Sequence, residues 1–463
     1  MKKIINLIVS LSLLMANTSC SFLEVERIGK SDIQTYFSEV TALEPAMNGI
    51  YNLMFSFYDR YHILYSEICA DALILSASSG GTWVDYQNFV ATSNYETSAV
   101  GYIWKSGYEI INNANQVIHW APVLKESYPH DVEMIDNVTA SAYFVRALIH
   151  FDLCRVYGQN YTYTDNAGHL GVAIRDKIPS LSETIARSTV KQCYQQCLDD
   201  INMALQTYSN CAYDAFRPTP LACKALLARI YLYMNDMTNA EKYASEVIAQ
   251  KNLTPRNEYL EMFCDPQEVG EEAIYRLNSM FDYLSPDARP ASGLLAKFAD
   301  DDIRKQLFSY SYSGTDYPNV MLKYTCTADV KSDEDRYYNL SVFRLSEMYL
   351  IRAEARCALG ILDGAESDLK ALIARATGRN ASEIDLAWST ANELDSLINE
   401  ERQKELCFEG HRFFDIARRH EDLIRDGSTT STVSRLEYPD NRFVLQIPYV
   451  EIDANHDMQQ NPL

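Results

Sequence analysis

One tryptophan in this 463-residue chain stands among side chains that could hold a ligand. Trp83 follows two glycines and is itself followed by Tyr86, Gln87 and Asn88. An aromatic ring stacks on the apolar face of a ligand such as a sugar ring, and polar groups beside it hydrogen-bond to hydroxyls. An aromatic residue in a long loop can equally pin that loop to the core. The residues alone leave both interpretations open.

A dense run of charged residues lies at 400–418, which reads EERQKELCFEGHRFFDIAR. On a helix this spacing brings like charges together, as in Glu401–Glu405 and Glu405–Glu409, and such pairs need cations nearby. We expect Arg402 and Arg412 to supply these cations locally. We interpret the run as a structural network rather than an acid and base pair.

Catalytic signals are otherwise missing from the sequence. It has no GxSxG elbow, Walker loop, HExxH or Rossmann glycine pattern. The 8 histidines are dispersed, and we interpret His150 and His411 as packed residues. The run of three aspartates at 300–302 could bind a cation, but a solvated helix start explains it better. The sequence therefore favours a protein that is not an enzyme and holds no metal or cofactor.

The first 19 residues predict a signal peptide. Two lysines precede an apolar stretch at 4–16, which is too short for the ~20 residues that span a membrane. Small residues then lead to Cys20, as in the cleavage box of bacterial lipoproteins, where the cysteine carries lipid. A plain secretory signal is the alternative. With lipidation, the mature chain is anchored to a membrane rather than threaded through it.

The other ten cysteines are scattered and form no CxxC pair, so neither a zinc knuckle nor a thioredoxin motif is present. We expect them to act as small buried hydrophobic residues. The charge balance, 41 Lys+Arg against 63 Asp+Glu, argues against nucleic acid as a partner. Removal of Lys2 and Lys3 would take the net charge from −22 to −24, which favours neutral ligands over anionic ones.

The elements that must position these residues are helical. Apolar residues at helical spacing, small alanines and polar turns predict helical hairpins at 220–250 and 343–375, of the tetratricopeptide type. Two stretched copies pair 142–153 with 188–206, and 44–57 with 103–119. We predict a last helix at 391–419. The irregular stretches 76–101, 281–340 and 426–463 are long enough to be functional.

Six blocks, in order, resemble the SusD/RagB family of outer-membrane lipoproteins from Bacteroidota. They are the opening CSFLEVE at Cys20, a helix with Trp104, Tyr108, Ile111 and Asn115, the block AYFVRALIHFDLCRVYG at 142–158, FRLSEMYLIRAEA at 343–355, EERQKELCFEGHRFFDIAR at 400–418, and the closing LQIPYVEIDANHDMQQNP at 445–462. Asn17 in the cleavage box and Ile149-His150 depart from the family pattern.

The resemblance implies a mainly helical fold with about four tetratricopeptide-like hairpins, little β structure and one loop-rich side that binds ligand. We expect residues 20–463 to form a single domain, with an N-terminal part to 280 and a C-terminal part from 281. The family's partner is a SusC-like TonB-dependent transporter, to which the protein delivers glycan from the cell surface.

The resemblance also suggests the ligand site. It places ligand contacts in the loop around Trp83, Tyr86 and Asn88, and in the stretch before the FRLSEMYL helix. That stretch contains Tyr283, Tyr310 and Tyr312, and Asp71 matches an acidic position near the family's site. Some relatives handle peptides instead. A helical interaction module that binds no small molecule is a further alternative.

Overall fold

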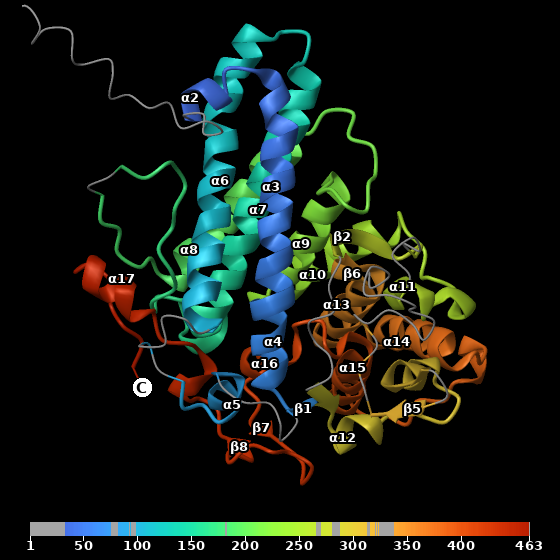
Figure 1. Ribbon diagram of the computed structural model, residues 1–463. Coiled ribbons are helices and arrows are strands. Elements are labelled where there is room, and N and C mark those ends of the chain that lie inside the picture. Colours follow the sequence, from blue (N-terminus) through green and yellow to red (C-terminus); the bar gives the residue numbers. More distant parts are fainter. Residues whose placement is uncertain are drawn as a thin grey trace, which may run out of the picture.

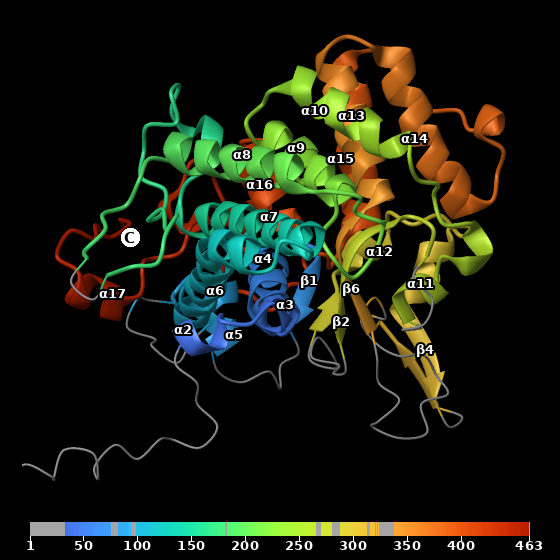
Figure 2. The same cartoon turned by 90° about the horizontal axis from the view of Figure 1, so that it is seen from above.

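The computed structural model describes residues 33–75, 82–91, 93, 99–180, 183–264, 270–279, 288–312, 315–319, 321, 323 and 338–462. Long helices stacked side by side make up most of this part of the chain (Figures 1 and 2). Shorter helices and two-stranded sheets surround the stack, and most of them lie at the bottom and at the right of Figure 1.

Four pairs of helices form the stack, and each helix packs along its partner. The pairs are α3 (Leu43–Phe57) with α6 (Ala99–Ser127), α7 (Val132–Tyr157) with α8 (Val190–Thr207), α9 (Pro220–Tyr233) with α10 (Met237–Ile248), and α13 (Leu345–Ala358) with α14 (Leu362–Thr377). A ninth long helix, α15 (Ala391–Leu406), packs against α13 and α14. The predicted hairpins, including the two stretched ones, are confirmed.

Local sequence explains why a hairpin forms at α9 and α10. Thr219 caps α9 by accepting the backbone N–H of Ala222, and a proline occupies the first helical position. Asp236 caps α10 in the same way. Ala228 and Ala240 are fully buried, so the two backbones can approach closely where the helices pack.

The charged segment 391–419 does not form one continuous helix. The prediction of a continuous helix over 391–419 is wrong, because α15 ends at Leu406 and α16 (Arg412–Arg418) starts after a break. Phe408 and Gly410 in this break have φ values of 66° and 85°. That left-handed conformation cannot continue a right-handed helix. The break turns α16 toward α4 (Ile63–Ile68), against which it packs.

The strands of the described residues form four two-stranded antiparallel sheets. They are β1 (Leu73–Leu75) with β3 (Ala288–Pro290), β2 (Ala273–Ser279) with β6 (Tyr338–Arg344), β4 (Ser309–Tyr312) with β5 (Thr315–Pro318), and β7 (Leu423–Ile424) with β8 (Arg435–Leu436). The remaining short helices are α2 (Ile33–Tyr36), α5 (Thr82–Gln87), α11 (Glu261–Cys264), α12 (Ser292–Leu295) and α17 (Tyr449–Ala454). The expected small share of β structure is confirmed.

One large apolar core joins the first three helix pairs to the strands β2 and β6. Trp104 is buried in it, with its ring edge-on to Tyr157 at a centroid distance of 5.0 Å. Trp120 and Trp388 are half-buried and pack against apolar clusters. Trp83 is also partly buried and packs against the large core, so its place among polar residues, rather than its burial, is what distinguishes it as the candidate for ligand contact.

Candidate ligand-binding site

Trp83 lies on the short helix α5, not in a loop as its glycine-rich surroundings suggest. Its ring packs at a centroid distance of 5.4 Å from the ring of Tyr86, which is buried against Tyr65. Trp83 itself is only half-buried. The indole therefore packs against Tyr86 and the core, and part of the residue remains accessible to solvent.

Asn88 follows α5 and is tied to a distant segment of the chain. Its Oδ1 accepts the backbone N–H of Thr432 at 2.7 Å, the Thr432 hydroxyl at 2.9 Å and the Ser431 hydroxyl at 3.1 Å. All three bonds engage the amide oxygen, so they fix the side chain while its NH₂ group takes part in none of them. A rigidly held amide donor therefore lies next to α5.

Arg425 holds the ends of α4 and α5 together, and sequence reasoning missed it. Its guanidinium donates to the carbonyl oxygens of Cys69 and Ala70 at 2.9 Å and of Gln87 at 2.8 Å. Burial lowers the pKa of this arginine. No sequence signal marks it, because its acceptors are backbone groups that lie far away in the chain.

Asp71 is committed to an ion pair. Its carboxylate accepts two bonds from Arg412, from Nε at 2.8 Å and from Nη2 at 2.7 Å, and a longer one from Gln403. This paired geometry connects the segment after α4 to the start of α16. In the structure Asp71 therefore holds the segment that follows α4, and precedes α5 in the chain, against α16.

Of the predicted tyrosines, the structure places only the backbones of Tyr310 and Tyr312. Tyr283 lies outside the described residues, just ahead of β3 in the chain, and Leu75 of β1 pairs with Ala288 of β3. The backbones of Tyr310 and Tyr312 form β4, while their side chains lie outside the described part. Both views place the β4–β5 hairpin away from α5, with β1 and α12 between them (Figures 1 and 2). Cys20 also lies outside the described residues.

The charged run forms the expected structural network, centred on Glu405. Its carboxylate accepts from Arg304 at 2.8 Å, and from Arg344 and Arg375 at 2.6 Å each. All four side chains are buried. Burial opposes ionisation of Glu405, but the three surrounding arginines hold its pKa well below the ordinary value.

The source of the cations was predicted wrongly. Arg402 pairs with Asp415 at 2.8 Å and Arg412 pairs with Asp71, so neither neutralises Glu405 or Glu409. Glu409 is held instead by Arg344 at 2.7 Å and by Lys323 at 2.6 Å. The cations come from separate segments that the fold brings to α15.

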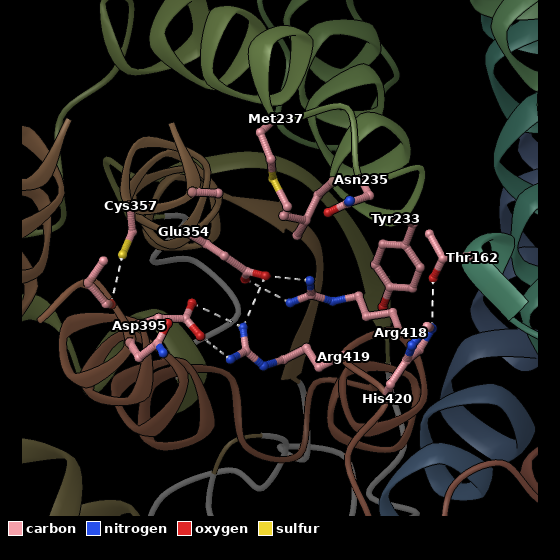
Figure 3. A pocket seen from close by; sticks show the side chains of 14 residues that line it. Thr162, Tyr233, Asn235, Met237, Glu354, Cys357, Asp395, Arg418, Arg419 and His420 are labelled. Atoms are coloured by element: carbon pink, nitrogen blue, oxygen red, sulfur yellow. Dashed lines mark hydrogen bonds and ion pairs between the residues drawn. The ribbon is translucent and has the colours of Figure 1, made fainter. Parts of the chain in front are cut away.

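A pocket of about 520 Å³ lies between the α9–α10 turn, α13, α15 and the end of α16 (Figure 3). Figure 3 shows Glu354 between Arg418 and Arg419, with Asp395 beside the second arginine. Arg418 donates twice to Glu354, at 2.6 and 2.8 Å, and Arg419 reaches Asp395 at 2.5 Å. Burial opposes ionisation of Glu354, but Arg418 and Arg419 lower its pKa to about 2. Its charged groups are already paired, which makes this pocket a structural junction.

The described residues offer little for catalysis or metal binding. Burial lowers the pKa of His62 to about 4 and of His150 to about 3, and that of His411 well below its usual value. These imidazoles are neutral at pH 7. Among the described residues, no group of three or more His, Cys, Asp and Glu side chains could hold a metal ion. Asp302 caps a helical turn and pairs with Arg304, rather than forming a solvated helix start.

The cysteines whose side chains the structure describes are Cys69, Cys154, Cys193, Cys197, Cys211, Cys223, Cys357 and Cys407; they are free, and all but one are buried, as expected from the sequence. The exception is Cys211, which is partly exposed.

Comparison with known proteins identifies the family. Residues 305–463 match the model of the SusD family, and residues 21–232 match a related model described as starch-binding and associating with the outer membrane. The chain belongs to the SusD family. The resemblance seen in the sequence blocks is confirmed, and the family is one associated with the outer membrane.

Relatives of SusD type align over nearly the full length of the chain. A SusD-like protein, P2, from Formosa agariphila is 24% identical over 97% of both chains. The crystal structure of a SusD superfamily protein from Bacteroides thetaiotaomicron is 25% identical, with a TM-score of 0.79 over 91% of this chain and 99% of that one. The crystal structure of a "putative sugar binding protein" from Bacteroides vulgatus is 25% identical, with a TM-score of 0.78 over 91% and 98%. The SusD fold predicted from the sequence is thereby confirmed.

Within the part of this SusD-family chain that the structure describes, none of the helices combines the length and apolar character that crossing a membrane requires.

Proposed function

We propose that this SusD-family protein is a lipid-anchored, non-catalytic receptor. It binds glycan outside the cell and delivers it to a SusC-like TonB-dependent transporter in the outer membrane. The observation that carries the proposal is the match of two SusD-type models along most of the chain. A carbohydrate ligand is supported by the starch-binding character of the first model and by the likeness to the sugar binding protein from Bacteroides vulgatus.

In this proposal the ligand lies against α5. The partly exposed ring of Trp83 stacks on a sugar ring, and the buried ring of Tyr86 packs against the indole. The fixed amide of Asn88 donates to a hydroxyl, and Asp71 keeps α16 and the end of α4 in register. Longer ligands would reach beyond α5 and contact Tyr283, Tyr310 and Tyr312.

The direct test is isothermal titration of the mature protein with neutral polysaccharides, such as amylopectin, xyloglucan, mannan and arabinoxylan. We expect one of these to bind with heat that saturates, and we expect no reducing ends to be released during incubation. Binding of a peptide digest in place of every glycan would move the protein to the peptide-binding relatives. Release of reducing ends would contradict a receptor without catalysis.

The lipid anchor is tested at Cys20. We expect the Cys20→Ser variant to leave the membrane fraction for the soluble one, while the unchanged protein partitions with detergent and is digested by protease added to intact cells. Retention of the variant in the membrane would contradict the anchor. The transporter partnership is tested by affinity purification from membranes of the native cells, in which a TonB-dependent transporter should co-purify at a constant ratio.

A further inference from the structure

A second groove, of about 1030 Å³, lies far from α5. It is lined by the first half of α3, the start of α7 and the segment 208–219, which leads from α8 to α9. That segment is the yellow-green loop at the upper right of Figure 1, whereas α5 lies at the bottom. A helix rises 1.5 Å per residue, and the groove lies at the start of α3, whereas α4 follows α3 in the chain. The length of these helices therefore separates the groove from the end of α4 by about 30 Å. The groove is therefore not part of the site around Trp83.

Tyr213 forms an aromatic platform in this groove. Its hydroxyl donates to the carbonyl oxygen of Ala273 at 2.7 Å, and the ammonium of Lys251 lies 4.1 Å from its ring centroid. Nevertheless 48% of the residue remains exposed. A ring fixed at its tip and beside one face, yet open to solvent, can stack on a ligand without the entropy loss of ordering a free side chain.

Polar groups that a ligand could recruit lie in the same groove. Arg217 is 3.4 Å from Glu44 and 3.7 Å from Asp214, and each of these three side chains is about half exposed. Exposed ion pairs of this kind contribute only about 0–1 kcal/mol to the stability of a protein. Ligand hydroxyls can therefore replace them at little cost. The pocket of Figure 3 is different, because its charges are buried and held at short range.

We propose that this groove is a second carbohydrate site, which takes a neutral oligosaccharide through stacking on Tyr213. The volume is at the upper end of the ~300–1,000 Å³ typical of ligand pockets. The carboxylates that line the groove outnumber its cations, Arg217 and Lys251, since Glu44, Asp131, Glu133 and Asp214 all face it. That excess disfavours sulfated or uronic-acid sugars. The inference rests on the proposed function, because it assumes that the protein binds glycan.

The test is the number of ligands bound per chain. The experiment titrates four proteins, namely the wild type, Trp83→Ala, Tyr213→Ala and the double variant. The ligands are maltohexaose, cellohexaose, xylohexaose and mannohexaose. We expect two molecules per wild-type chain, one per single variant and none for the double variant. Tyr213→Phe, which keeps the ring, should retain the second site. Tyr163→Ala removes another exposed tyrosine elsewhere and should leave both sites intact.

The outcomes separate this proposal from the proposed function. One molecule per wild-type chain, lost with Trp83→Ala and unaffected by Tyr213→Ala, would overturn the second site and leave the proposed function standing. Loss of all binding with Tyr213→Ala alone would support the groove and remove Trp83 from the site. No binding of any glycan, oligosaccharide or polysaccharide, to wild type would overturn both.

Cys211 provides an independent readout, because it lines the groove and is the one described cysteine that is not buried. Its alkylation by N-ethylmaleimide is followed by mass spectrometry of the peptide that contains it. In Trp83→Ala, a hexasaccharide at ten times its dissociation constant should slow the reaction about tenfold if the bound sugar covers the thiol. An unchanged rate under saturating ligand would place the sugar elsewhere and contradict the proposal.

Discussion

The region around α15 and α16 and the region around α4 and α5 use polar residues in opposite ways. In the first, Glu405 is buried and surrounded by three arginines from other segments. In the second, Trp83 packs against Tyr86 and is partly exposed, and Asn88 is held through its amide oxygen. The carboxylates of the charge-rich motif are therefore paired within the protein, whereas in our proposal the segment around α5 offers Trp83 and Asn88 to a ligand.

The comparison shows that density of charged residues is a poor guide to function. The residues of 400–418 could be mistaken for acid and base groups, but the carboxylates of Glu405, Glu409 and Asp415 are each paired with a buried cation. A ligand site requires groups that are held in place and still accessible. The two regions are linked by Glu67, which accepts the backbone N–H of Gly410, and by the pair of Asp71 with Arg412.

The largest expected effect comes from removing the centre of the charged region. Glu405→Ala leaves Arg304, Arg344 and Arg375 buried with one partner fewer, which should cost about 3–5 kcal/mol of unfolding free energy. Urea denaturation followed by circular dichroism measures it. As a control, Glu366→Gln breaks only the partly exposed pair with Lys370 and should cost at most about 0.5 kcal/mol. Equal losses in the two variants would contradict the network's structural role.

We predict that Glu67, which links the two regions, makes the stability of the protein depend on pH. Burial raises the pKa of this carboxyl from 4.5 to about 7, opposed in part by backbone N–H groups of 408–411. The folded state then keeps a proton that the unfolded state has lost, so the wild type loses stability as pH rises from about 4.5 to 7. Glu67→Gln removes this loss. The variant should match the wild type at pH 4.5 and be more stable at pH 8, by up to about 3 kcal/mol. A stability difference independent of pH would contradict this account.

A variant of Asp71 tests whether its ion pair with Arg412 stabilises the fold or whether the carboxylate contacts the ligand. Asp71→Asn removes the charge from two bonds with Arg412, which should cost about 2 kcal/mol of unfolding free energy. We expect glycan affinity of the folded variant to fall by less than threefold, because the carboxylate is occupied by Arg412. A much larger loss of affinity, at unchanged stability, would assign Asp71 to direct ligand contact.

The helix pairs could be predicted from the sequence because their signals are local. Ala228, Ala240, the capping residues and the turn between them lie within one short stretch. The break after Leu406 could not be predicted, since it depends on Gly410 packing beside Ile63 of α4. The cations around Glu405 were missed for the same reason, because Arg304 and Arg344 lie far away in the chain.

The candidate site was predictable only in part. Trp83 and Asn88 became candidates because an unusual aromatic residue stands beside polar ones in the sequence, and their role in binding stays a prediction. The residues that hold them, Arg425, Ser431 and Thr432, carry no such signal, since they act through the backbone and through segments joined only by the fold.

The most direct test of the central claim is a paired titration of Trp83→Ala and Trp388→Ala with the glycan that binds the wild type. Both tryptophans are partly buried and pack against apolar clusters, Trp83 against the large core and Trp388 against the cluster of α13, α14 and α15, away from α5. Loss of an aromatic anchor costs about 2 kcal/mol or more, so the affinity of the α5 site should fall about 30-fold or more in Trp83→Ala. Trp388→Ala should bind like the wild type. Unchanged affinity in Trp83→Ala, with its fold intact by circular dichroism, would show that ligand does not bind at α5.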